Sequence, residues 1–280
     1  FAGWSFFGNG AYMLNTQGVD MLINIFFGVT FNAARGVATQ VQNAVMQFVN
    51  NFTVAVNPQI TKSYASGERE YMYKLVCRGA KYSYFLLLVF LVPIVCEADY
   101  ILWLWLKVVP EHAPTFLRLA LFSSLVMGMG NTLYTAIFAT GKIRNYQLWI
   151  TVAGCLVFPL TWVAFELGLP AAATYVIFII VYYALVFVRL FIAKGLLGVP
   201  LWPYIREVVM RTFAVSAVAF VLPLLVVYGL PQGFVRLCVT CAVSLLSTLA
   251  GIYFIGLGRD ERRKMVGKAW NIVRKRLHKN

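Results

Sequence analysis

Charge is scarce in this sequence, and negative charge is the scarcest. Only 12% of the 280 residues are charged, Asp and Glu together number 10, and 61% of the residues are hydrophobic. An ordinary soluble domain carries about 25% charged residues, so the composition excludes that class. His occurs only twice. Cys238 and Cys241 have a spacing seen in zinc sites, but no second pair and no His lie nearby. We therefore expect a polytopic membrane protein with no metal and no other cofactor.

Several functional signatures are also missing. No Gly-x4-Gly-Lys-Ser/Thr sequence occurs, so we do not expect ATP hydrolysis by this chain. The five cysteines fall within or beside apolar segments and show no disulfide framework. The net charge of +14 comes without a recognisable nucleic-acid-binding module, so we expect no nucleic acid partner. The chain opens with Phe1 in an apolar stretch and without Met, which predicts that an N-terminal part is missing.

Long apolar runs are what the sequence has in abundance. A spanning helix needs about 20 apolar residues, and the chain divides into about eight such runs. This predicts an all-α integral membrane bundle of about eight transmembrane helices. A short interfacial helix is expected between the third and fourth spans, and a proline-interrupted turn before the seventh. The predicted spans are 4–30, 33–60, 76–97, 113–140, 145–167, 171–194, 207–229 and 234–257.

The basic residues predict how the chain lies in the membrane. Alternate connections and the C-terminal tail hold 20 of the 24 Lys and Arg, and such residues gather on the cytoplasmic side. Both ends of the chain are therefore expected in the cytoplasm. The tail, 258–280, alternates cations with apolar residues, which is typical of a basic amphipathic helix on the anionic membrane surface, although an unstructured tail remains an alternative.

A polar stripe runs along the first two predicted spans. In the second span, polar side chains recur at steps of three or four and are expected to share one helix face. The first span places Asp20 and Asn24 inside an apolar run, and an acid within the membrane indicates a functional site. Together these side chains predict the wall of a wet cavity. The stripe residues are Asn9, Thr16, Asp20 and Asn24, then Arg35, Thr39, Gln42, Asn43, Met46, Asn50, Thr53 and Asn57.

Four stretches around this stripe resemble a known family. Residues 32–36 read Asn-Ala-Ala-Arg-Gly, 40–42 read Gln-Val-Gln, 48–52 read Phe-Val-Asn-Asn-Phe, and 57–68 read Asn-Pro-Gln-Ile-Thr-Lys-Ser-Tyr-Ala-Ser-Gly-Glu. They are similar to the Wzx-type polysaccharide and O-antigen flippases of the multidrug/oligosaccharidyl-lipid/polysaccharide (MOP) exporter superfamily. The match is most specific over residues 15–70.

The resemblance implies an architecture and a location. Family members have two six-helix lobes around a central cavity, often followed by two extra helices. It thus implies that 1–195 is the second, MATE-like lobe, that 196–257 holds two additional helices, and that the first lobe of the same protein is a missing partner. It also implies the bacterial cytoplasmic (inner) membrane as the location.

The resemblance further implies a substrate. Such flippases move an undecaprenyl-diphosphate-linked oligosaccharide to the periplasmic face by alternating access, for O-antigen, capsule or exopolysaccharide synthesis. Membrane lipids and a polysaccharide polymerase are the other implied partners. Arg35 offers a planar fork for a diphosphate, while amides suit sugars. The expected substrate-binding residues are Arg35, Asp20, Asn24, Thr39, Gln42, Asn43, Asn50 and Asn57.

Alternatives remain open for the residues and for the function. Arg35 lies near a predicted helix end, where it could snorkel to the interface, and Asp20 could pair with Arg35 or bind a coupling ion. A set on the fourth span, which includes Asn131 and Thr135, could close the cavity or simply bond neighbouring helices. A cation-coupled multidrug exporter of the same superfamily is one alternative function. A membrane polymerase or ligase for lipid-linked glycans is another, although we predict no enzyme because the longest outer loop lacks clustered Arg, and His112 is expected to be a loop residue rather than a base.

Overall fold

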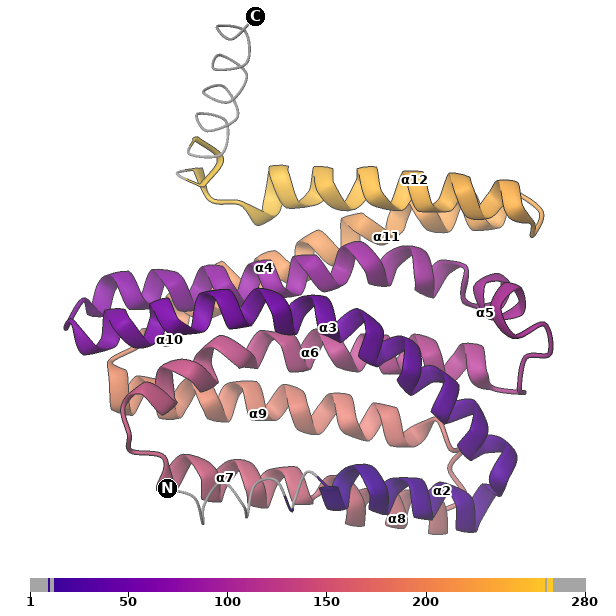
Figure 1. Cartoon of the computed structure of the whole chain (residues 1–280), viewed down its shortest axis with the longest axis horizontal. Helices are drawn as coiled ribbons and strands as arrows, with labels where there is room; N and C mark the ends of the chain where they lie inside the picture. The colour runs from indigo at the N-terminus through magenta and orange to yellow at the C-terminus, as the bar shows by residue number, and fades with distance from the viewer. Residues whose placement is uncertain (1–9, 11–12, 260, 264–280) are drawn as a thin grey trace, which may run out of the picture.

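The computed structural model describes residues 10, 13–259 and 261–263, and this part of the chain is helical throughout with short connections and no strand (Figure 1). The tail segment 264–280 and Asn9 lie outside the described residues. In chain order the elements are η1 (Leu14–Gly18, a π-helical turn), α2 (Val19–Phe27), α3 (Val29–Ala65), α4 (Arg69–Cys96), α5 (Ala98–Leu106), α6 (Ala113–Ala139), α7 (Arg144–Cys155), α8 (Val157–Glu166), α9 (Ala173–Leu197), α10 (Leu201–Tyr204), η2 (Ile205–Met210), α11 (Arg211–Gly229), α12 (Phe234–Gly251) and η3 (Ile252–Gly256).

Within the described residues, six helices are long and apolar enough to cross a membrane, which is the character of a multi-pass membrane protein. They are Arg69–Cys96, Ala113–Ala139, Arg144–Glu166, Ala173–Leu197, Leu201–Gly229 and Phe234–Gly256. The 37-residue α3 is long enough but too rich in amides to be among them, and η1 and α2 together are short. The membrane character and the all-α class are thus confirmed, while the count of eight spans stays a prediction.

Two predicted spans are interrupted for identifiable reasons. Gly28 has φ 85° and separates α2 from α3, so the first span ends there and α3 begins earlier than predicted. The fifth span divides at Leu156 into α7 and α8. Pro159 has no N–H to donate to the carbonyl of Cys155, which weakens the helix at that point. The short helix expected between the third and fourth spans is α5, and α10 forms before the seventh.

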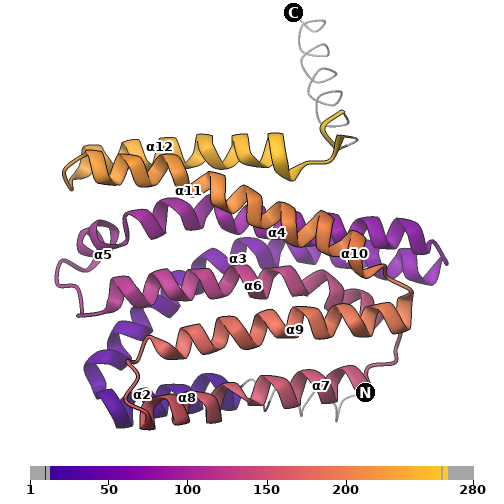
Figure 2. The ribbon, with the colours of Figure 1, turned by 180° about the vertical axis from the view of Figure 1, so that it is seen from behind.

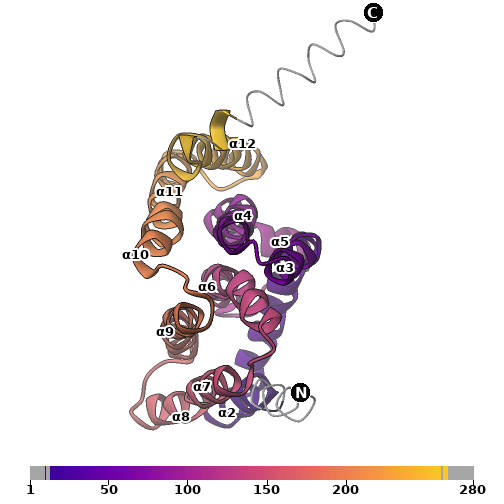
Figure 3. The same ribbon diagram turned by 90° about the vertical axis from the view of Figure 1, so that its left-hand side faces the viewer.

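The centre of the bundle is α6, which packs against α3, α4 and α9 (Figure 3). Its contact with α4 depends on a small residue, since a Cβ on Gly79 would lie 2.6 Å from Cγ2 of Thr132. The Thr132 hydroxyl donates a hydrogen bond to the carbonyl of Val76 at 3.0 Å. Small residues and hydroxyl bonds of this kind are the usual means by which membrane helices approach closely.

The connections between helices gather at two ends of the bundle. The α3–α4, α6–α7 and α9–α10 connections lie at one end, and the α2–α3, α8–α9 and α11–α12 connections lie at the other (Figures 1 and 2). The first set carries the basic residues that we expect to face the cytoplasm, including Lys62, Lys142 and Arg144. The chain therefore sorts its charge by end, and the assignment of that end to the cytoplasm stays a prediction.

Two buried charge clusters join α4 to the segment that holds α11 and α12. At the α5 end, the fully buried carboxylate of Glu97 accepts a hydrogen bond from Arg236 Nη2 at 2.9 Å and another from the Thr240 hydroxyl at 2.9 Å. At the other end, the ammonium of Lys81, which is also fully buried, lies 2.9 Å from Glu261 Oε2 and 3.5 Å from Glu207 Oε1. We call these the Glu97 cluster and the Lys81 cluster.

Candidate functional site

The exposed face of α3 carries a ladder of carboxamides. Gln40, Asn43, Gln47, Asn50 and Asn51 are all exposed, and we call this set the amide ladder. Their steps of three, four, three and one residues place them on one side of an α-helix, where each residue turns by about 100°. Within the ladder, Gln47 Nε2 lies 3.5 Å from Asn51 Oδ1. The ladder presents donors and acceptors over about three helical turns.

Other members of the predicted stripe face inward and hold α3 against α6. Gln42 Nε2 donates to the Ala120 carbonyl at 3.0 Å and lies 2.9 Å from Ser124 Oγ. Further along, the Thr135 hydroxyl donates to Asn57 Oδ1 at 2.9 Å. Gln42 and Asn57 therefore act as interhelical contacts in this structure, which favours the bonding interpretation of Thr135 over cavity closure.

The predicted stripe does not form a single surface. Asn43 and Asn50 are exposed, whereas Thr53 is buried and Thr39 and Arg35 are partly buried. At 100° per residue, the centre of the exposed face lies about 90° around the helix axis from the centre of the predicted stripe. The stripe therefore runs along the border between the exposed surface and the surface that packs against α6. Gln40, Gln47 and Asn51, which the prediction missed, complete the exposed face. The sequence signal for these three residues was their spacing of seven and four positions, which places them on one helix face.

Asp20 and Arg35 form an ion pair next to the turn at Gly28. Asp20 Oδ1 lies 3.1 Å from Arg35 Nη1, and their side chains are 39% and 13% exposed. So little exposure does not fit a side chain that snorkels along the surface. The same Nη1 atom is buried and makes no hydrogen bond of good geometry within the described part of the chain. The charge of Arg35 is thus paired with Asp20, and Tyr175 is a further electrostatic neighbour. Asn24, on α2, is exposed.

Searches of protein-family models, curated proteins and solved structures return no match for this chain. The site must therefore be interpreted from its own chemistry. An exposed ladder of neutral amides suits a ligand that carries many hydroxyls.

Arg189 is a residue whose contacts the sequence did not predict. It falls inside the predicted span 171–194, although the charge count groups it with the basic connection that follows, and the structure has it within α9. Its guanidinium packs against Gly130 on α6, where a Cβ would collide with it. Tyr134 and Tyr146 are its electrostatic neighbours. Its Nε atom is buried without a hydrogen-bond partner among the described residues. The paired glycines 128 and 130 on α6 were the sequence signal for this close approach.

Proposed function

We propose that this chain is the second lobe, with its two additional helices, of a flippase that moves a lipid-linked oligosaccharide across a membrane. The observation that carries the proposal is the amide ladder. Five exposed carboxamides on one face of a membrane-protein helix are costly against lipid, because hydrocarbon offers them no hydrogen-bond partner. A polar cavity completed by another lobe gives this face both water and a substrate to bind.

The chemistry of the substrate class follows from the residues. Carboxamides donate and accept at the same time, as sugar hydroxyls do, so the amide ladder suits a glycan of variable structure. The planar fork of the Arg35 guanidinium suits the diphosphate that links the glycan to its lipid. Undecaprenyl diphosphate carriers in a bacterial cytoplasmic membrane have both parts, and O-antigen or capsule precursors are the proposed cargo. A downstream polysaccharide polymerase is the proposed consumer.

The first experiment tests export. The chain is joined to the N-terminal lobe of an oligosaccharide flippase, expressed in a strain that lacks its own flippase, and surface glycan is quantified. We expect restored glycan with the native sequence. The double variant Asn43→Leu/Gln47→Leu should lose roughly tenfold or more, since each lost hydrogen bond is worth about 1 kcal/mol. Gln232→Leu removes an exposed amide from the α11–α12 connection and is the matched control.

The outcomes separate the candidates. If the double variant exports as well as the native sequence, the amide ladder does not contact the glycan. Drug accumulation in the same cells then tests the cation-coupled multidrug exporter.

A second experiment separates ligand binding from structure at the ion pair. Arg35→Ala removes the proposed diphosphate contact, and we expect export to be abolished while the amount of protein in the membrane stays normal. Asp20→Asn breaks the same ion pair and leaves the guanidinium in place, so it should retain export. Equal loss in both variants would instead make the pair structural, and unchanged export in Arg35→Ala would remove Arg35 from the site.

A further inference from the structure

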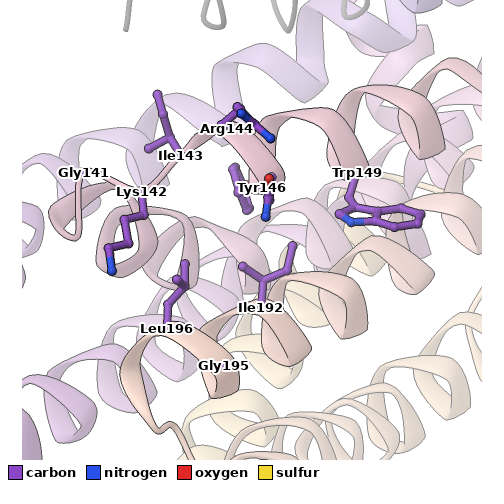
Figure 4. A pocket seen from close by; sticks show the side chains of 10 residues that line it. Gly141, Lys142, Ile143, Arg144, Tyr146, Trp149, Ile192, Gly195 and Leu196 are labelled. Atoms are coloured by element: carbon purple, nitrogen blue, oxygen red, sulfur yellow. The ribbon is translucent and has the colours of Figure 1, made fainter.

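A largely apolar pocket lies away from the amide ladder, between the α6–α7 connection, the start of α7 and the end of α9. It has a volume of about 700 Å³. Its floor is apolar, with Ile192 and Leu196 on α9, and its α7 side carries Tyr146 and Trp149. Figure 4 shows Lys142 and the indole of Trp149 at opposite ends of the pocket. One end is thus cationic and the other is aromatic and apolar.

The cationic end is held by Lys142 and Arg144. Both side chains are exposed, and within the described residues neither one forms an ion pair with an acid. No Asp or Glu lines the pocket. Arg144 also begins α7, where the first backbone N–H groups point outward and add positive potential. The positive charge at this end is therefore left uncompensated by the protein.

Gly195 has no side chain and so leaves open space in the pocket. A Cβ built on Gly195 meets no atom within 4 Å, so packing inside the chain does not require a glycine there. Ile192, Gly195 and Leu196 follow one another at helical steps of three and one, and they form a shallow apolar track that leads from the basic end along α9. The shape suits a hydrocarbon chain.

We propose that this pocket binds an anionic phospholipid of the surrounding bilayer. The phosphate lies against Lys142 and Arg144, and one acyl chain follows the track past Ile192 towards Trp149. The charge and the location favour a lipid over other occupants, since basic pockets between membrane helices recognise anionic headgroups and tryptophan is favoured at the interface. The proposal does not depend on the transport function proposed above.

Native mass spectrometry of the full chain in detergent tests the proposal directly. The chain is titrated with phosphatidylglycerol and with phosphatidylcholine of the same acyl chains. We expect phosphatidylglycerol to bind about tenfold more tightly, and this preference to disappear in Lys142→Gln/Arg144→Gln. Lys194→Gln is the matched control, because Lys194 is exposed at the same end of α9 and does not line the pocket. Unfolding temperatures of all variants establish that they are folded.

Two further arms distinguish a lipid from a soluble anion. Gly195→Leu fills the track and should weaken phosphatidylglycerol binding, while millimolar inorganic phosphate should not displace the lipid. Displacement by phosphate together with unchanged binding in Gly195→Leu would identify a soluble-anion site and overturn the proposal. Equal binding of the two lipids, or equal behaviour of the double variant and Lys194→Gln, would overturn it as well.

Discussion

Polar side chains on α3 and polar side chains around α12 lie in contrasting surroundings. The amide ladder is exposed, and among the residues that the structure describes its side chains contact one another at Gln47 and Asn51. In the Glu97 and Lys81 clusters, each central charge is fully buried and has at least two partners. Removing a partner from a buried charge of this kind destabilises the fold, whereas exposed amides can exchange partners freely. The contrast separates groups that stabilise the chain from groups that are available to a ligand.

The largest expected effect comes from Lys81→Met. It removes the cation from Glu261 and Glu207 and leaves Arg78 as the remaining cation bound to Glu261, at 3.1 Å. Removing one member of a buried ion pair costs about 3–5 kcal/mol. Thermal unfolding in detergent measures the loss. Lys74→Met is the control, since Lys74 pairs with Glu70 at the surface and should change stability by less than about 0.5 kcal/mol. Equal effects of the two variants would contradict the importance of burial.

At the other end of the helix pair, Arg236→Met should destabilise the chain by about 3–5 kcal/mol, which is the usual cost of breaking a buried ion pair. The loss should be of the same order as that of Lys81→Met, because Thr240 still donates to Glu97 much as Arg78 still binds Glu261. Replacing both members, as in Glu97→Leu/Arg236→Leu, should recover part of the loss, because no charge is then left buried alone. A double-mutant cycle of unfolding free energies measures this recovery, and strict additivity would exclude direct coupling.

Lowering the pH should weaken the Lys81 cluster, because Glu261 then takes up a proton. Burial alone raises the pKa of Glu261, but the Gly258 N–H, Lys81 and Arg78 favour the carboxylate and bring the pKa below its usual 4.5. A lowered folded-state pKa gives stability that is present above the unfolded value and is lost as the pH falls through the folded value. The unfolding temperatures of the native chain and of Glu261→Gln should therefore converge below pH 4.5. A constant difference down to strong acid would contradict this.

The smallest effects compare two amides on the two sides of α3. Gln42→Leu removes the hydrogen bonds to Ala120 and Ser124 and should cost about 1 kcal/mol. Gln47→Leu changes an exposed side chain and should stay within about 0.5 kcal/mol. Unfolding free energies of the two variants measure the difference. A larger loss in Gln47→Leu would mean that the amide ladder is structural.

Local patterns predicted most of the helices, but not where two of them are interrupted and not which helices pack together. Apolar runs marked the membrane helices, and the acids and aromatics after Glu97 marked α5. The Asp20–Arg35 pair was one of the two alternatives for Asp20, since charges inside a helix bundle usually find a partner, and the structure has it. The Lys81–Glu261 contact spans 180 positions, and no local periodicity encodes such a pairing.

The candidate site was predicted in part for a related reason. Helical spacing located α3 as the polar helix, and Asn43 and Asn50 are indeed exposed. Periodicity alone could not tell which side of the stripe would meet α6. The side of α3 that meets α6 depends on the positions of Ser123 and Ser124, because their hydroxyls accept hydrogen bonds from the Gln42 amide. Arg189 lies inside the predicted span 171–194, but its contact with Gly130 on α6 joins two distant helices and no local pattern encodes it.

The Lys81 cluster also has a consequence for biosynthesis. A ribosome makes Lys81 180 residues before it makes Glu261, which at about 5–20 residues per second is an interval of roughly 10–35 s. During the first 126 residues of this interval the ammonium of Lys81 has neither acid to bind, and Glu207 is made before Glu261. The Lys81 cluster is therefore completed only after α12 has been made. A truncated product that lacks Glu261 would keep Glu207 beside Lys81 at 3.5 Å but would lose the closer of the two acids.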